Sequence, residues 1–264
     1  MFKALQALHF VWQSTEAMLI RFFPYISNNG DGRPESCIFS SFLNICAMFS
    51  ALIVHLRYDL IAELNRNSND MLTIINKLSW YFGMIGAFGM FLVANFQESA
   101  VIQVHLTGAF LSFGFGCVYM LCHAGLSHLM VPLFASRRVA HIRTVLSVVG
   151  IFAFFTCEFS KTTLFTAKTC FSAFTCGILA SNEFHKYHPD LPTPRPWTRK
   201  NPHEGFKLHC VSAGAEWTLA VINVLFFLSY SRDFEKIQVK LTVNPLVGHL
   251  DMSPQWSSES NLVD

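Results

Sequence analysis

Long apolar runs separated by short polar segments dominate the hydropathy pattern of this chain. A membrane-spanning helix needs about 20 mostly apolar residues to cross a hydrocarbon core of about 30 Å. Five windows reach that length: residues 37–56, 78–96, 101–122, 144–180 and 211–230. The runs are continuous and do not alternate with a period of two, which excludes a transmembrane β-barrel. The pattern predicts an all-α, polytopic transmembrane helix bundle with five clear spans.

The amino-terminal 23 residues give a weaker pattern. Two apolar patches, at residues 4–12 and 17–23, are separated by the polar residues 13–16, which include Glu16. An ionised side chain near the bilayer centre costs about 2.5–3.5 kcal/mol on insertion scales. A sixth span here is therefore doubtful, and we expect an interfacial helix.

The window 144–180 is longer than one crossing requires. As a single helix its 37 residues would extend over about 55 Å. Glu158, Lys161 and Lys168 interrupt it. One span with an interfacial or re-entrant piece is the first interpretation, and two spans are the second. The distribution of basic residues slightly favours the second.

Small residues form faces within two of the windows. Gly83, Gly86 and Gly89 recur at helical spacing with Ala87, and Ser112 and Gly116 lie four residues apart. Small residues let membrane helices approach closely. We expect these faces to be helix-packing surfaces.

Composition agrees with a membrane protein and limits its partners. The chain is 52% hydrophobic and 14% charged, whereas soluble domains carry about 25% charged residues. The net charge is only +2 and no basic run occurs, so we expect no nucleic-acid partner. The expected organisation is an amino-terminal segment and luminal loop (1–36), a helix bundle (37–241) and a disordered cytosolic tail (242–264).

The basic residues give the expected orientation. Nine lie on one side of the membrane: Arg57, Arg66, Lys77, Arg137, Arg138, Arg143, Arg232, Lys236 and Lys240. Six lie on the other: Arg33, Lys186, Arg195, Arg199, Lys200 and Lys207. The side with more Lys and Arg is predicted to be cytosolic.

A set of polar residues gathers at the predicted non-cytosolic ends of four helices. Its members are Glu35, Asn95, Gln97, Glu98, His105, His209 and Glu216. Glu216 lies about five residues, or roughly 8 Å, inside the last window, and an ionisable group at such depth indicates a functional site. His209 lies two helical turns earlier on the same face. The set would bind a polar ligand or share a proton, or else form a satisfied cluster that fixes helix register.

Sequence motifs for catalysis are missing. The chain has no nucleophile elbow, His-Glu-x-x-His or Walker loop. Its eight cysteines include no Cys-x-x-Cys pair, and the spacing of His105, His209 and Glu216 fits no zinc site. We therefore expect a non-enzymatic protein without metal or cofactor. His123 and His128 are expected to be snorkelling or loop residues.

Several motifs carry a family resemblance. They are Pro24-Tyr25-Ile26-Ser27 with Gly30 and Pro34-Glu35-Ser36, Ala94-Asn95-Phe96-Gln97-Glu98, His105 with Gly108-Ala109, Ile142-Arg143, Asn201-Pro202 with Gly205 and His209, Ala215-Glu216-Trp217, and Arg232-Asp233-Phe234. In this order and spacing, from residue 24 to about 241, the chain resembles the damage-regulated autophagy modulator family. That family belongs to a wider Frag1/Sfk1-like group of multispanning proteins.

The resemblance implies a six-span protein of lysosomal or late endosomal membranes, with both termini in the cytosol. It further implies a positive regulator of autophagy, sometimes of apoptosis, whose partners are membrane lipids and other membrane or autophagy proteins. It favours one span between Arg143 and the loop at 182–210. Other members of the wider group imply an alternative, a lipid-handling function in phospholipid asymmetry, phosphoinositide kinase regulation or GPI-anchor lipid remodelling. Because only 23 residues precede Pro24, we expect a truncated or replaced first span.

Overall fold

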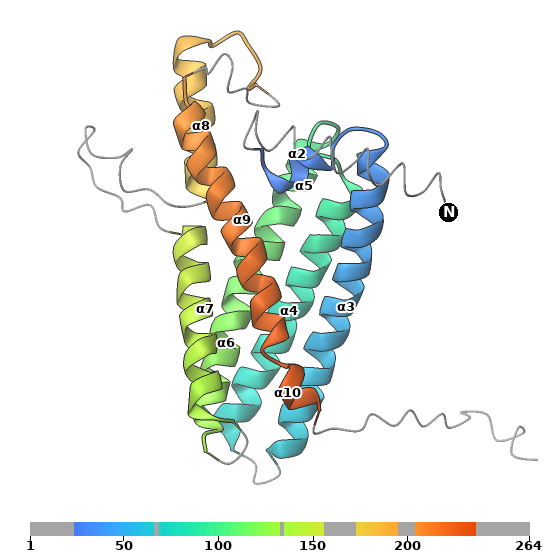
Figure 1. Ribbon diagram of the computed structural model, residues 1–264, viewed down its shortest axis with the longest axis vertical. Coiled ribbons are helices and arrows are strands. Elements are labelled where there is room, and N and C mark those ends of the chain that lie inside the picture. Colours follow the sequence, from blue (N-terminus) through green and yellow to red (C-terminus); the bar gives the residue numbers. More distant parts are fainter. Residues whose placement is uncertain (1–23, 66–68, 133–134, 156–172, 195–203, 236–264) are drawn as a thin grey trace, which may run out of the picture. The chain divides into compact units, whose positions relative to one another are not determined.

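The computed structural model describes residues 24–65, 69–132, 135–155, 173–194 and 204–235 (Figure 1). Within these ranges the chain is helical and contains no strand. Residues 1–231 form one compact unit and residues 232–264 another. The helices are α2 (Ile26–Asn29), α3 (Glu35–Leu64), α4 (Asp70–Asn95), α5 (Ile102–Phe110), the π-helical η1 (Leu111–Phe115), α6 (Gly116–Leu129), α7 (Arg137–Phe155), α8 (Ala173–Tyr187), α9 (Phe206–Leu228) and α10 (Ser231–Phe234).

Four helical segments are long and apolar enough to cross a membrane. They are Glu35–Leu64, Asp70–Asn95, Ile102–Leu129 and Phe206–Phe234. The third consists of α5, η1 and α6, which continue one another. These segments correspond to four of the five windows expected from hydropathy. The prediction of an integral, all-helical membrane protein is confirmed.

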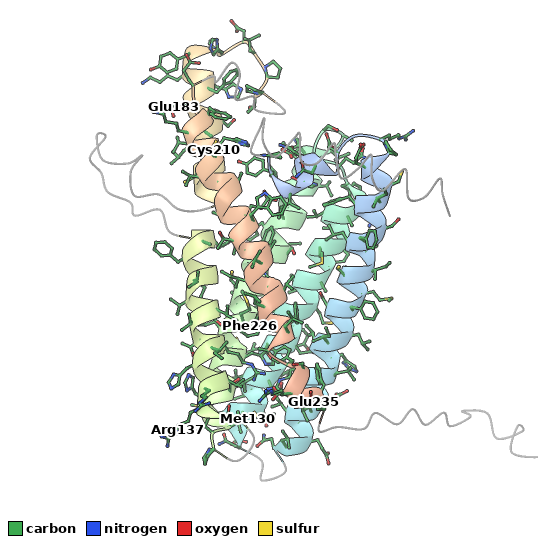
Figure 2. The ribbon with its side chains drawn as sticks, viewed as in Figure 1. Met130, Arg137, Glu183, Cys210, Phe226 and Glu235 are labelled. Atoms are coloured by element: carbon green, nitrogen blue, oxygen red, sulfur yellow. The ribbon has the colours of Figure 1, made fainter. Side chains whose placement is uncertain are left out.

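The helices pack in a simple order. In Figure 1, α3 lies beside α4, α4 beside α5 and α6, α6 beside α7, and α9 beside both α7 and α8. Since successive spans reverse direction, residues 24–34, 96–101 and 188–194 lie at one end of the bundle, here called the α2 end. The connections at 65–69 and 130–136 lie at the other. Figure 2 labels Glu183 and Cys210 toward the α2 end, and Arg137 and Met130 at the opposite end.

The predicted small-residue faces pack against each other, which confirms their role. A Cβ atom on Gly89 would lie 2.7 Å from the carbonyl oxygen of Gly108, and one on Gly108 would lie 3.0 Å from that of Gly89. On Gly86, a Cβ atom would lie 3.5 Å from the backbone nitrogen of Gly116. The backbones of α4 and of α5–α6 therefore come together closely, as small residues permit.

The overlong window 144–180 divides between two helices. α7 ends at Phe155 and α8 begins at Ala173, and Glu158, Lys161 and Lys168 fall outside the described residues. Neither helix is among the described segments that are long and apolar enough to cross a membrane by themselves. The expectation of a fifth span within this window alone is therefore not confirmed.

A buried cluster at the end opposite α2 joins α3, α6 and α7 to the residues that follow α9. Arg143 on α7 is fully buried. Its Nη1 group donates to Ser127 Oγ at 2.9 Å, while Nε and Nη2 donate to the Oγ and carbonyl oxygen of Ser229, each at 2.9 Å. The ring of Tyr230 lies 4.6 Å from the Arg143 guanidinium and 4.9 Å from that of Arg57. Both arginines are thus placed for cation–π contact with one ring.

The position of His123 corrects a prediction from the sequence. We expected His123 to be a snorkelling or loop residue, but it is 1% exposed. Its ring lies 4.4 Å from that of Tyr119 and 5.6 Å from that of Tyr230. Packing between two aromatic side chains holds the imidazole inside the bundle. His128, in contrast, is exposed.

Candidate functional site

Two adjoining cavities occupy the α2 end of the bundle. The first has a volume of about 300 Å³ and is lined by residues of α2, α5, η1, α7, α8 and α9. The second has a volume of about 360 Å³ and lies among α2, α3, α4 and α5. Ser27, Glu98 and His105 line both. These three residues therefore form the wall between the cavities.

Tyr25 attaches the segment before α2 to the last long helix. Its hydroxyl donates to Ser212 Oγ at 2.9 Å, and its ring meets the ring of His209 edge-on at 4.7 Å. His209 is fully buried behind it. Burial raises the pKa of the Tyr25 phenol well above its usual range, so the hydroxyl stays protonated and acts as a donor.

Two further hydrogen bonds fix the same segment against α9. The backbone N–H of Ile26 donates to Glu216 Oε2 at 3.3 Å, and Trp217 Nε1–H donates to the carbonyl oxygen of Pro24 at 3.2 Å. Ser212 and Glu216 are four residues apart and therefore lie on one face of α9. That spacing lets a short extended segment bond to two successive turns.

Glu98 and His105 are the buried polar residues of the dividing wall. Glu98 is 9% exposed and His105 is 4% exposed. Ser27 Oγ donates to Glu98 Oε2 at 3.2 Å. His105 Nδ1 lies 2.7 Å from the carbonyl oxygen of Phe96, and because a carbonyl only accepts, Nδ1 carries the hydrogen. In the neutral imidazole, Nε2 is then an acceptor.

The structure separates the seven predicted residues into groups. Glu98, His105 and Glu216 line the first cavity, and Asn95, Gln97, Glu98 and His105 line the second. Asn95 exchanges hydrogen bonds of 2.9 and 3.2 Å with Asn44 across α3 and α4. His209 contacts Tyr25. Glu35 begins α3 and lines neither cavity.

Three residues of the site were not predicted from the sequence: Tyr25, Ser27 and Ser212. Tyr25 and Ser27 belong to the Pro24-Tyr25-Ile26-Ser27 motif, which was noted for its resemblance and not for its chemistry. Ser212 gives no signal of its own in an apolar window. Its spacing of four residues from Glu216 is the only indication that the two share a face.

An apolar wall faces the polar groups of the first cavity. Leu106, Ala109 and Phe113 come from α5 and η1, Phe154 from α7 and Ile178 from α8. Phe113 lies within the π-helical segment, and such segments are frequent at functional sites. The cavity is therefore polar on one side and hydrocarbon-like on the other, which suits an amphiphilic ligand.

Comparison with known proteins identifies the family. The family model described as Frag1/DRAM/Sfk1/Cwh43P N-terminal domain matches residues 4–237. The chain belongs to this family. The match includes every residue of both cavities, and it begins within the segment 1–23, which lies outside the described residues. The resemblance seen in the motifs is confirmed.

Two of the known proteins that resemble this chain match more than four fifths of it, and a third matches about half. DNA damage-regulated autophagy modulator protein 2 of Bos taurus is 32% identical over 219 residues, 83% of this chain and 74% of the relative. DNA damage-regulated autophagy modulator protein 1 of Homo sapiens is 32% identical over 222 residues, 84% of this chain and 81% of the relative. Modulator of macroautophagy TMEM150B-B of Xenopus laevis is 36% identical over 126 residues, 48% of this chain and 52% of the relative. No solved structure matches.

The contact between Tyr25 and Ser212 gives a first prediction. Tyr25→Phe and Ser212→Ala each remove one side of the 2.9 Å hydrogen bond. A hydrogen bond of this kind contributes about 1 kcal/mol, so we expect each variant to lower the free energy of unfolding by about that amount. The double variant is expected to lose less free energy of unfolding than the two single variants lose together, because both remove the same hydrogen bond. Thermal unfolding in detergent micelles measures this, with Tyr187→Phe at an exposed position as the neutral control. If the loss in the double variant equalled the sum of the two single losses, the hydrogen bond between Tyr25 and Ser212 would be contradicted.

Proposed function

We propose that this chain is a non-enzymatic regulator in lysosomal or late endosomal membranes that promotes autophagy, with apoptosis as a further outcome. The observation that carries the proposal is its similarity to two proteins named autophagy modulators, each 32% identical over more than four fifths of this chain. The geometry of the site supports binding, because the first cavity has buried polar side chains on one side and an apolar wall on the other. Membrane lipids and other membrane or autophagy proteins are the proposed partners.

The proposed topology treats α7 and α8 as two parts of one crossing. α7 contacts the carboxy-terminal half of α9, where Arg143 bonds to Ser229. α8 contacts the amino-terminal half, where a Cβ atom on Gly177 would lie 3.1 Å from Ser212 Oγ. The two helices thus follow α9 in antiparallel order. With the four long spans this gives five crossings; the sixth that the family resemblance implies would fall on residues 1–23, outside the described residues. The α2 end then faces the lumen.

Localisation and autophagic flux test this function together. A tagged chain is expected to colocalise with a lysosomal marker. It is also expected to increase turnover of the lipidated autophagosome protein, followed with and without lysosomal inhibition. Glu216→Gln is expected to remove most of that increase, because it alters a carboxylate of the first cavity, whereas Glu35→Gln keeps it. Plasma-membrane or Golgi signal with unchanged flux would overturn the proposal.

A lipid-handling function is the second candidate, and the amphipathic first cavity favours it. In this case Glu216→Gln changes the lipid composition or transbilayer asymmetry of the host membrane while the protein still folds. Lipid analysis of membranes from cells expressing either form provides the measurement. Identical lipid profiles would exclude this candidate.

A further inference from the structure

We infer that the second cavity binds the neutral sugar headgroup of a glycolipid. The cavity lies at the α2 end among α2, α3, α4 and α5 (Figure 1). It is located where the span α3 begins and the span α4 ends, which is the level of lipid headgroups. The inference rests on the lipid-handling candidate of the proposed function and gives that candidate a ligand class.

The described lining of this cavity combines hydrogen-bond donors with acceptors. Arg33 has a guanidinium that only donates, whereas the carboxylates of Asp31 and Glu98 only accept when ionised. Ser36 and Gln97 can do both. The side chains of Arg33, Ser36 and Gln97 form no hydrogen bond with the described residues. A ligand that bonds to these groups together must itself donate and accept at several neighbouring atoms.

Hydroxyl groups on a ring meet this requirement. Each hydroxyl has one donor and two acceptor lone pairs, and a sugar ring carries several of them at fixed spacing. An ammonium headgroup only donates, and a phosphodiester only accepts, so either would use only part of the lining. The cavity volume of about 360 Å³ lies within the range of small-molecule pockets. It suits a sugar ring with its linkage to the lipid.

Hydrogen bonds within the protein hold the two carboxyl groups of the lining in place. Asp31 Oδ1 accepts from the backbone N–H and the Oγ of Ser99, at 3.2 and 2.9 Å. Glu98 Oε2 accepts from Ser27 Oγ at 3.2 Å. Side chains that are already fixed lose less conformational entropy when a ligand binds. The acceptor side of the cavity is therefore preorganised.

An apolar surface next to the cavity indicates where the lipid tail would lie. Ser41 on α3 and Asn95 on α4 line the cavity and are exposed. One helical turn from each, on the same helix faces, Ile45 is 48% exposed and Phe91 is 47% exposed. The ring of Phe91 stacks on that of Phe88, which is 55% exposed, at 6.3 Å. A headgroup in the cavity would thus continue into a tail along α3 and α4.

A matched pair of ligands tests the inference on the purified, full-length chain. The chain is held in micelles of octaethylene glycol monododecyl ether, a detergent without sugar. Dodecyl β-D-glucoside or its tetra-O-methyl ether is added at the same mole fraction, and thermal unfolding is recorded. We expect the glucoside to raise Tm by about 5 °C at saturation. The methyl ether should leave Tm unchanged, because its oxygens accept but no longer donate. Equal shifts would overturn the inference.

Methyl β-D-glucoside distinguishes a lipid headgroup from a free sugar. It has the same ring but lacks the tail that would lie along α3 and α4. We expect it to leave Tm unchanged at the concentration at which the dodecyl glucoside saturates. An equal shift would show that the ligand is a free sugar and would overturn the assignment to a glycolipid.

Variants of the lining locate the site. Gln97→Ala and Arg33→Ala each remove donors from the cavity and are expected to weaken the affinity for dodecyl glucoside by about fivefold. Gln103→Ala is the matched control, because Gln103 is exposed and lines neither cavity. It should bind as the parent does. An unchanged glucoside response in both cavity variants would overturn the inference. The ligand series on the unmodified chain decides the question even where a variant fails to fold.

Failure of this inference is distinguishable from failure of the proposed function. If dodecyl glucoside does not bind but the chain still increases flux in lysosomes, the role in autophagy stands and the ligand class is wrong. If the glucoside binds but the chain neither reaches lysosomes nor changes flux, the ligand class stands and the role in autophagy is wrong. If the glucoside binds while the lipid profile of the host membrane stays the same, the cavity recognises a glycolipid without a lipid-handling function.

Discussion

Arg143→Met is expected to lower the free energy of unfolding by about 3 kcal/mol. Arg143 is fully buried and makes three hydrogen bonds of 2.9 Å, to Ser127 and Ser229. Hydrogen bonds to charged groups contribute about 1.5–3 kcal/mol each, and relief of the desolvated charge offsets part of their loss. The variant also loses the cation–π contact with Tyr230. Thermal or denaturant unfolding in micelles gives the measured difference.

The matched control for Arg143 is on the same helix. Arg138 is exposed, so Arg138→Met should change stability by no more than about 0.5 kcal/mol. The hydroxyls of Ser127 and Ser229 also donate to the carbonyl oxygens of His123 and Phe226, at 2.7 and 2.6 Å. Those bonds persist in the variant, so a large loss would come from the arginine itself. Equal stability of the two variants would show that Arg143 does not hold α7 to α6 and α9.

Gly89→Ala is expected to destabilise the protein by about 2 kcal/mol. Its new methyl group would lie 2.7 Å from the carbonyl oxygen of Gly108 and 2.7 Å from Leu111 Cβ. Both neighbours belong to the continuous third span, so relief requires α4 and α5 to move apart. Overpacking of this kind costs about 1–3 kcal/mol. The midpoint of thermal unfolding in micelles reports the change.

Gly125→Ala controls for the general effect of adding a methyl group to a helical glycine. Nothing lies within 4 Å of a Cβ atom built on Gly125, and alanine is the better helix former by about 1 kcal/mol. We therefore expect this variant to be as stable as the parent or slightly more stable. If Gly89→Ala were as stable as Gly125→Ala, the close approach of α4 and α5 at Gly89 would be contradicted.

The two ends of the bundle differ in chemistry. At the α2 end, the carboxyl groups of Glu98 and Glu216 and the imidazole of His105 line open volume. At the opposite end, Arg143 and Arg57 are buried around a single aromatic ring. The first arrangement is suited to binding, and the second to holding helices together. Variants at the two ends should therefore separate loss of the effect on autophagic flux from loss of stability.

Several features of this protein followed from the sequence alone. Long apolar runs without alternation form helices in lipid, because every backbone polar group must be satisfied within the segment and a closed barrel would need an alternating pattern. Glycine spacing on α4 indicated its packing face, since only small residues permit close backbone contact. The alternating direction of the spans brought Glu98, His105 and Glu216 to the same end, because each helix end is fixed by where its apolar run stops.

The tertiary structure decided which of those residues meet. A helix that is apolar on every face carries no pattern to show which side faces lipid and which faces protein. Rotation about the helix axis, set by packing, places Ser212 against Tyr25 and encloses His123 between Tyr119 and Tyr230. The same packing leaves Glu35 outside both cavities. Hydropathy thus determined how deep in the membrane each polar residue lies and at which end of the bundle. Side-chain packing between helices determined its neighbours.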